Sequence, residues 1–109
     1  MKGHRSTVVS LTPFVMSGIP YLISVGKDRQ ILVWKSDENG LYSLNCKLPK
    51  AHARIIWSSC AVLQGLDGFA VFATGSRDKT VKLWKTTGGD ELIVHLFYVF
   101  YVDVEGNRM

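Results

Sequence analysis

Residues 28–35 read DRQILVWK, and residues 78–85 read DKTVKLWK. The second stretch repeats the first at an offset of 50 residues, with Asp, a basic residue, two branched apolar residues, Trp and Lys in matching positions. Self-similarity at a fixed spacing of this size is the sequence signature of a repeat architecture. Because apolar and turn-forming residues alternate in short runs, we predict an all-β chain that contains two copies of one antiparallel unit.

The similarity extends upstream of both stretches. Each is preceded by an apolar run that ends in a hydroxyl residue four positions before the Asp, and further upstream by a small residue followed by His. An indole N–H can only donate, a hydroxyl can donate and accept, and a carboxylate can fix the tautomer of an imidazole. We therefore expect two hydrogen-bonded structural tetrads, formed by His4, Ser24, Asp28 and Trp34, and by His52, Thr74, Asp78 and Trp84.

Turn residues separate the expected strands. The first unit has expected strands at 7–11, 21–25, 31–34 and 41–47. The second has them at 55–63, 69–74 and 80–84, with an outer strand after Glu91. Residues 91–102 are apolar on both faces and lack the alternation of a half-exposed strand, so this tail is an aggregation hazard unless it is covered.

These features resemble the WD40-repeat family, although both copies end Trp-Lys and lack the Trp-Asp of the name. The resemblance implies two four-stranded antiparallel WD40 blades of an incomplete β-propeller. Blade one would span 1–49, the first three strands of blade two 50–85, and the atypical tail 86–109, where its outer strand would lie. Because propellers use about four to eight blades, we expect the remaining blades in cis or in trans. A fragment of a longer protein is the favoured explanation; an incomplete gene product and a ring-completing oligomer are the alternatives.

A narrower resemblance rests on KAHARIIW at 50–57 and FATGSRDK at 72–79. These stretches are similar to the family of second subunits of the Elongator complex, which modifies wobble uridines of tRNA. The resemblance implies a protein-protein interaction scaffold whose partners are the protein subunits of a larger complex, with the catalytic chemistry in another subunit. A generic WD40 adaptor, and a truncated product without independent function, remain the alternatives.

A set of His, hydroxyl and Asp also occurs in hydrolases, where it is catalytic. A nucleophilic serine needs an exposed, strained turn such as GxSxG, and neither Ser24 nor Thr74 lies in one. We therefore expect no enzyme activity. No phosphate-binding loop, HExxH or CxxC motif is present, so no cofactor and no metal are expected. Cys46 and Cys60 are expected to be reduced, buried thiols.

Charge and hydropathy limit the partners. Thirteen Lys and Arg against nine Asp and Glu give a net charge of +4 without any block of like charge, so direct, specific nucleic-acid binding is not expected. The longest apolar run is too short to span a membrane, and no signal peptide is recognisable, so we expect the chain in the cytoplasm and in the nucleus as well.

Four basic residues are candidate partner contacts, the alternative being that they are merely solvated. Arg29, Arg77 and Lys79 lie in expected turns, and Arg54 follows the second His. The strand after Arg54 is expected to place Ile55 and Trp57 on one face, with Trp57 in the core. The alternative for Arg54 is a position on the rim of the propeller, in contact with another subunit.

Overall fold

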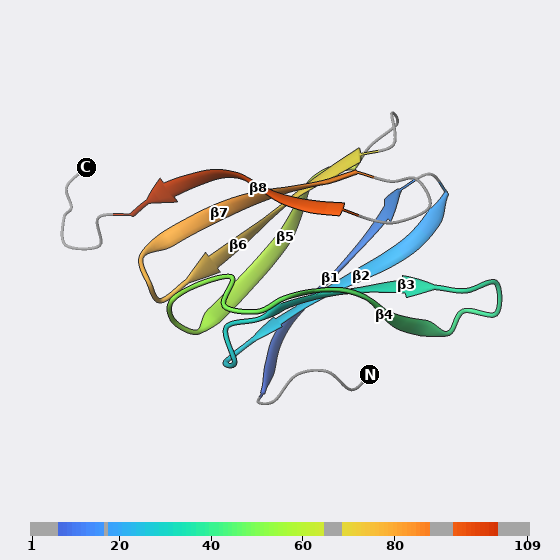
Figure 1. Cartoon of the computed structure of the whole chain (residues 1–109), viewed down its shortest axis with the longest axis horizontal. Helices are drawn as coiled ribbons and strands as arrows, with labels where there is room; N and C mark the ends of the chain where they lie inside the picture. Colours follow the sequence, from blue (N-terminus) through green and yellow to red (C-terminus); the bar gives the residue numbers. More distant parts are fainter. Residues whose placement is uncertain (1–6, 17, 65–68, 88–92, 103–109) are drawn as a thin grey trace.

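The computed structural model describes residues 7–16, 18–64, 69–87 and 93–102 (Figure 1). These residues contain no helix and form two four-stranded sheets, each a meander of antiparallel neighbours. The first sheet consists of β1 (Val8–Met16), β2 (Ile19–Gly26), β3 (Ile31–Ser36) and β4 (Tyr42–Leu48). The second consists of β5 (Ile56–Gln64), β6 (Phe69–Ser76), β7 (Thr80–Thr87) and β8 (Ile93–Tyr101). The prediction of two antiparallel four-stranded units is confirmed, and the two sheets do not close into a ring.

The first strand is longer than the sequence indicated. It was expected to end at residue 11, but β1 continues through Pro13 to Met16. Proline lacks a backbone N–H and is tolerated where one side of a strand needs no partner. Since β1 is an edge strand, Pro13 does not end it. The added residues include Phe14 and Met16, which are buried.

Residues 93–101 form the outer strand of the second sheet. β8 pairs with β7 from Ile93 opposite Thr87 to Tyr101 opposite Thr80. Its side chains keep the apolar character noted in the sequence, and Phe97, Tyr98 and Tyr101 are more than half exposed.

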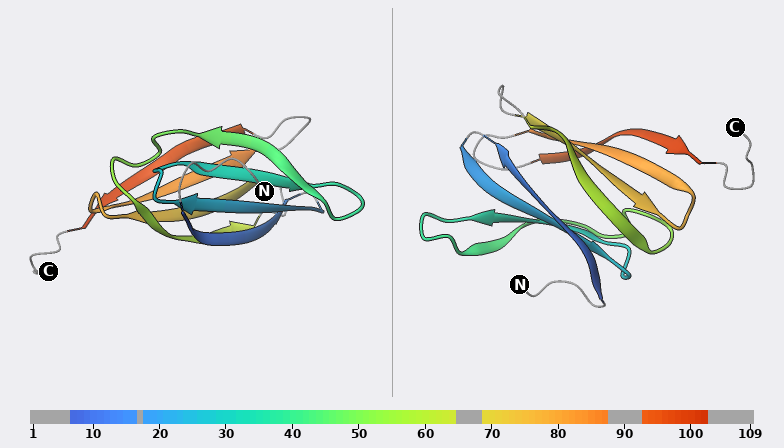
Figure 2. Two further views of the ribbon diagram at one scale, coloured as in Figure 1. Left: turned by 90° about the horizontal axis from the view of Figure 1, so that it is seen from below. Right: turned by 180° about the vertical axis from the view of Figure 1, so that it is seen from behind.

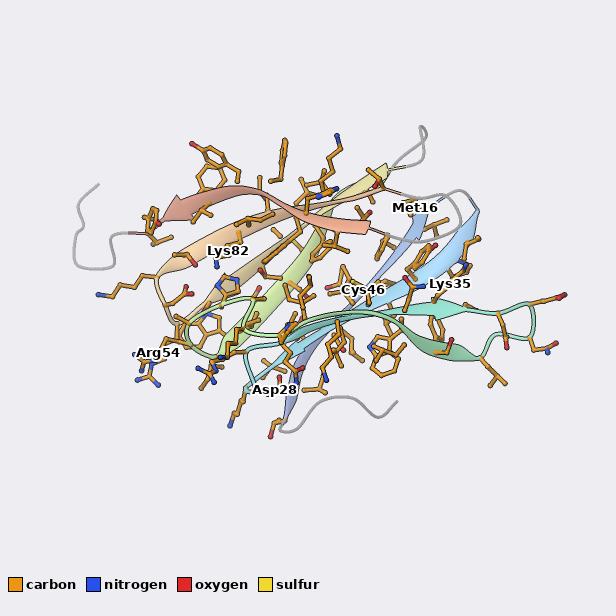
Figure 3. The ribbon with its side chains drawn as sticks, viewed as in Figure 1. Met16, Asp28, Lys35, Cys46, Arg54 and Lys82 are labelled. Atoms are coloured by element: carbon orange, nitrogen blue, oxygen red, sulfur yellow. The ribbon has the colours of Figure 1, made fainter. Side chains whose placement is uncertain are left out.

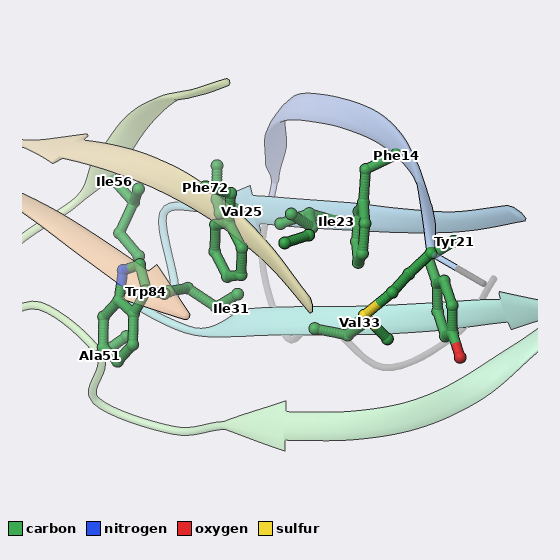
Figure 4. Close-up of a cluster of buried hydrophobic side chains, with 12 residues drawn as sticks. Phe14, Tyr21, Ile23, Val25, Ile31, Val33, Ala51, Ile56, Phe72 and Trp84 are labelled. Carbon is green, nitrogen blue, oxygen red and sulfur yellow. The ribbon is translucent and has the colours of Figure 1, made fainter. Parts of the chain in front are cut away.

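The two sheets pack face to face around one shared core (Figure 2). Four aromatic rings cross it in a row, with centroids 5.1 Å apart for Tyr21 and Phe14, 6.4 Å for Phe14 and Phe72, and 6.4 Å for Phe72 and Trp84 (Figure 4). Offset stacking of this kind adds to the burial of apolar area. Trp84 is a member of the aromatic row and also of the predicted second tetrad. The second tetrad is therefore built into the interface between the sheets.

A short polar contact also joins the sheets. The Ser59 hydroxyl on β5 lies 3.0 Å from that of Ser10 and 2.6 Å from that of Thr12, both on β1. Further along, Thr86 donates to the sulfur of Met16 at 3.5 Å. These bonds between buried or half-buried groups fix which strands of the two sheets lie side by side.

Gly26 is needed where β2 ends. A methyl group added there would lie 2.2 Å from the carbonyl oxygen of Thr7, which already accepts from the backbone of Lys27 at 3.0 Å. We expect Gly26→Ala to lower the free energy of unfolding by about 2 kcal/mol, since the backbone must move to relieve the clash. At Gly75 the nearest atom would be 3.9 Å away. Gly75→Ala should therefore change stability by less than about 0.5 kcal/mol in urea denaturation, and equal losses would contradict the steric argument.

Candidate functional site

The second tetrad forms one continuous hydrogen-bonded chain. The indole N–H of Trp84 donates to the hydroxyl of Thr74 at 2.9 Å, and that hydroxyl lies 2.7 Å from Nε2 of His52. On the other side of the ring, Nδ1 of His52 lies 3.0 Å from Oδ2 of Asp78. The same carboxylate accepts from the backbone N–H groups of Ala53 at 3.0 Å and Thr80 at 2.9 Å. All four predicted members are thus brought together, three from strands or their adjoining turn and His52 from the loop before β5.

The donors and acceptors in this chain fit a neutral imidazole. Because Trp84 can only donate, Thr74 accepts from it and can give its own proton to Nε2 of His52, leaving the proton on Nδ1 to Asp78. Burial lowers the pKa of His52 from 6.5, although Asp78 partly opposes this. Burial would raise the pKa of Asp78, but hydrogen bonds from Thr80, His52 and Ala53 outweigh it and lower that pKa from 3.8 to about 2.

These two pKa shifts predict a stability that falls with acidification. The unfolded chain binds a proton at His52 more readily than the folded chain, so stability should begin to fall as the pH drops below about 6.5. A second loss, of about 2 kcal/mol, should follow as the pH drops from 3.8 towards about 2, where Asp78 is protonated in the folded state. Urea denaturation between pH 7.5 and pH 5 would test the first step. His52→Gln should flatten it, and an unchanged slope in that variant would contradict the assignment.

The first tetrad is described only in part. The indole of Trp34 donates to the hydroxyl of Ser24 at 2.8 Å, as Trp84 does to Thr74. Asp28 accepts from the side-chain amide of Gln30 at 2.8 Å. His4 lies outside the described residues, so its predicted place in the tetrad stays a prediction.

Two of the four predicted contact residues occupy equivalent turns. Arg29 and Lys79 have backbone φ angles of 68° and 70°, in the left-handed region that costs non-glycine residues about 1 kcal/mol or more. In each turn the N–H of the basic residue donates to a carbonyl three residues earlier, that of Gly26 or Ser76, at 3.2 Å. Both side chains are exposed. The two turns therefore hold a basic residue in the same backbone conformation.

Trp57 corrects the prediction for the strand after Arg54. It was expected in the core beside Ile55, but its side chain is 55% exposed, while Ile56 is fully buried. Ile56 pairs with Ser76 and Ser58 with Gly75, so Trp57 is the extra residue of a β-bulge. A bulge redirects a side chain and breaks the alternation on which the prediction depended. Cys60 on the same strand is also exposed and Cys46 is half-buried, so the prediction of two buried thiols is wrong for Cys60 and holds only in part for Cys46.

An open groove of about 520 Å³ lies at this end of the second sheet. Three of the four candidate contacts line it, namely Arg54, Arg77 and Lys79, together with Trp57. Figure 3 shows Arg54 extending outward from the loop that leads into β5. Within the described residues none of these three cations forms an ion pair with a carboxylate. Arg29 does not line the groove.

Hydrogen bonds hold the walls of the groove together. The Ser76 hydroxyl donates to the carbonyl oxygens of Ile55 at 2.9 Å and Arg54 at 3.3 Å, and Arg77 N–H donates to Ile55 at 3.0 Å. The carbonyl of Lys79 accepts from the backbone of Val102 at 2.8 Å. The loop before β5, the turn between β6 and β7 and the end of β8 are therefore joined into one frame. Sequence reasoning had named the cations but not the groove.

The described residues bring no three His, Cys, Asp or Glu side chains together in a group that could hold a metal ion. In the same part of the chain there is no helix long and apolar enough to cross a membrane. The two sites that the structure does define are the buried tetrad and the basic groove.

Residues 46–85 match the family model for the WD domain, G-beta repeat, so this part of the chain is a WD40 repeat. The match covers β5, β6, β7 as far as Lys85, and the second tetrad. Within this class the chain is similar to Elongator complex protein 2 of several species. It is 39% identical to that of Schizosaccharomyces pombe over 78% of this chain, 42% to that of Saccharomyces cerevisiae over 75%, and 31% to that of Homo sapiens over 79%.

The match covers only part of each relative. The aligned residues are 11%, 10% and 12% of the length of these three proteins. The chain therefore spans about a tenth of the curated relatives that it matches.

Proposed function

We propose that this chain is a noncatalytic protein-interaction segment that acts as a scaffold within an Elongator-like complex, the assembly whose activity is wobble-uridine modification of tRNA. The partners are protein subunits of that complex, and the places of action are the cytoplasm and the nucleus. The similarity to Elongator complex protein 2 supports the choice of assembly.

One observation carries the noncatalytic assignment. The only His, hydroxyl and Asp set that the described residues complete is turned inward: His52 and Thr74 are each 1% exposed, and the Thr74 hydroxyl is occupied by Trp84 and His52. A nucleophile must reach its substrate. The solvent-facing surface of the same sheet instead carries a groove lined by exposed cations. Such a surface is suited to recognition of another macromolecule.

Co-purification tests this function. The chain, carrying an affinity tag, would be expressed in cells that hold an intact Elongator complex and recovered under mild conditions. We expect other Elongator subunits to be recovered with it, and in smaller amounts with the destabilised variant Gly26→Ala. Recovery of an unrelated complex without any Elongator subunit would favour a generic WD40 adaptor. Failure of the chain to accumulate in cells would favour a product without independent function.

A further inference from the structure

The groove at the end of the second sheet combines two kinds of surface. Its cations are Arg54, Arg77 and Lys79, all exposed, and its apolar contribution includes the indole of Trp57 with Val102. A volume of about 520 Å³ lies within the range of roughly 300–1,000 Å³ of ligand-binding clefts. Such a site has the dimensions and composition for a short segment of another molecule.

We propose that this groove binds an acidic segment of a partner protein, with its carboxylates on the three cations and an apolar or aromatic side chain against Trp57. The inference builds on the proposed interaction function and adds the chemistry of the ligand. Guanidinium groups pair with carboxylates through two parallel hydrogen bonds, and aromatic side chains anchor interfaces.

Charge complementarity carries the choice of an acidic ligand. Among the described residues, the carboxylate of the turn that carries Arg77 and Lys79 is that of Asp78, which is only 10% exposed and is occupied by His52, Ala53 and Thr80. It therefore stabilises the turn between two of the cations, Arg77 and Lys79, and is not available to neutralise them from the solvent side. A ligand carboxylate can supply the missing partner.

The remaining polar groups favour a protein segment over a nucleic acid. The hydroxyl of Ser76 donates to Arg54 and Ile55, and that of Thr80 contacts Asp78 and His52, so neither is free to donate to phosphate oxygens. Sequence-independent binding of single strands usually requires a basic groove with several stacking aromatic side chains. Within the part of the chain that is described, Trp57 is the aromatic side chain that lines this groove.

The site is prepared in advance of binding. The bulge at Trp57 directs the indole outward, and the left-handed conformation of Lys79 is fixed by its bonds to Ser76 and Val102. Strained backbone that the surrounding structure holds in place is concentrated at binding sites. At the equivalent positions of the first sheet, the bulged residue is Val9 and the turn residue is Arg29, so that turn has the charge without the indole.

A peptide titration with the purified chain tests the proposal. The probe is a fluorescein-labelled decapeptide of glutamate and serine with one central phenylalanine, and its control has glutamine at every glutamate position. Trp57 is the exposed one of the three tryptophans, so binding should also protect its fluorescence from acrylamide. We expect the glutamate peptide to bind at least about tenfold more tightly than the glutamine peptide, and its affinity to fall as salt is added.

Two matched variants identify the site. Lys79→Gly and Arg29→Gly each remove one positive charge from a left-handed turn that glycine adopts without strain. We expect Lys79→Gly to weaken the glutamate peptide about threefold or more, Arg29→Gly to leave it nearly unchanged, and the double variant Arg54→Ala/Arg77→Ala to weaken it about tenfold or more. In Trp57→Phe the peptide should no longer protect tryptophan fluorescence from acrylamide, while circular dichroism shows the fold intact.

Several results would overturn the proposal. These are no binding of the glutamate peptide, equal binding of the glutamine peptide, or equal losses in Lys79→Gly and Arg29→Gly. Tighter binding of decauridylate with the same dependence on the three cations would assign the groove to nucleic acid. Because this titration uses no other subunit, its failure would leave a positive co-purification result standing, and a failed co-purification would leave the peptide result standing.

Discussion

Asp78→Ala is expected to lower the free energy of unfolding by about 3 kcal/mol, because the variant removes the acceptor of several buried or half-buried hydrogen bonds. The donors left behind include Nδ1 of His52 and the backbone N–H groups of Ala53 and Thr80. Of these, His52 is 1% exposed and cannot turn to water without disturbing Thr74 and Trp84. Urea denaturation at pH 7, followed by tryptophan fluorescence, measures the loss.

The matched control is an aspartate in an exposed turn. Asp37 accepts from the backbone N–H groups of Asn39 at 2.8 Å and Leu41 at 2.9 Å, and both donors can be hydrated when it is removed. Asp37→Ala should therefore cost no more than about 1 kcal/mol. Equal losses in the two variants would mean that the buried hydrogen bonds of Asp78 stabilise the fold no more than those of an exposed turn. A hydrolytic activity lost in Asp78→Ala would overturn the noncatalytic assignment itself.

The repeat made this tetrad predictable from sequence. In the second set the indole only donates, the carboxylate only accepts, and the hydroxyl and imidazole can do both; the matching residue types recur in order in the first copy. The order of these residues in the chain and their hydrogen-bonding capacities therefore restricted the possible hydrogen-bond partners of Trp84 and His52. In the structure the donor and acceptor atoms of the predicted pairs lie within 3.0 Å of each other. The strands were predictable from apolar runs separated by turn residues, although β1 continues through Pro13 to Met16, beyond its expected end at residue 11.

The groove was only half predictable. Arg54, Arg77 and Lys79 were recognisable as exposed cations, but they lie on two separate turns that meet through the bonds of Ser76 to the loop before β5. Trp57 was misplaced because strict alternation puts it beside Ile55, and a bulge adds one residue that no local pattern marks. The first sheet has the equivalent bulge at Val9, whose side chain is also exposed, so the bulge recurs in both copies although the residue types at the two positions differ.

Of the two inner rings of the aromatic row, the one that contacts Trp84 is expected to matter most to stability. Phe72 is 1% exposed and stacks between Phe14 of the first sheet and Trp84 of the second. We expect Phe72→Ala to lower the free energy of unfolding by about 4 kcal/mol, since it opens a cavity in the core that the sheets share. Urea denaturation monitored by near-ultraviolet circular dichroism and by fluorescence would measure it.

Phe97→Ala provides the same substitution outside that core. Phe97 lies on β8 and is 58% exposed, so its truncation should change stability by less than about 1 kcal/mol. If both variants lose equally, the two sheets do not depend on one core. Phe72→Ala could instead give two unfolding transitions, one reported by Trp34 in the first sheet and one by Trp84 in the second. That result would mean that each sheet stays folded without the other. A single coincident transition is expected, because the ring that braces Trp84 also covers Phe14, and neither sheet can bury its inner face alone.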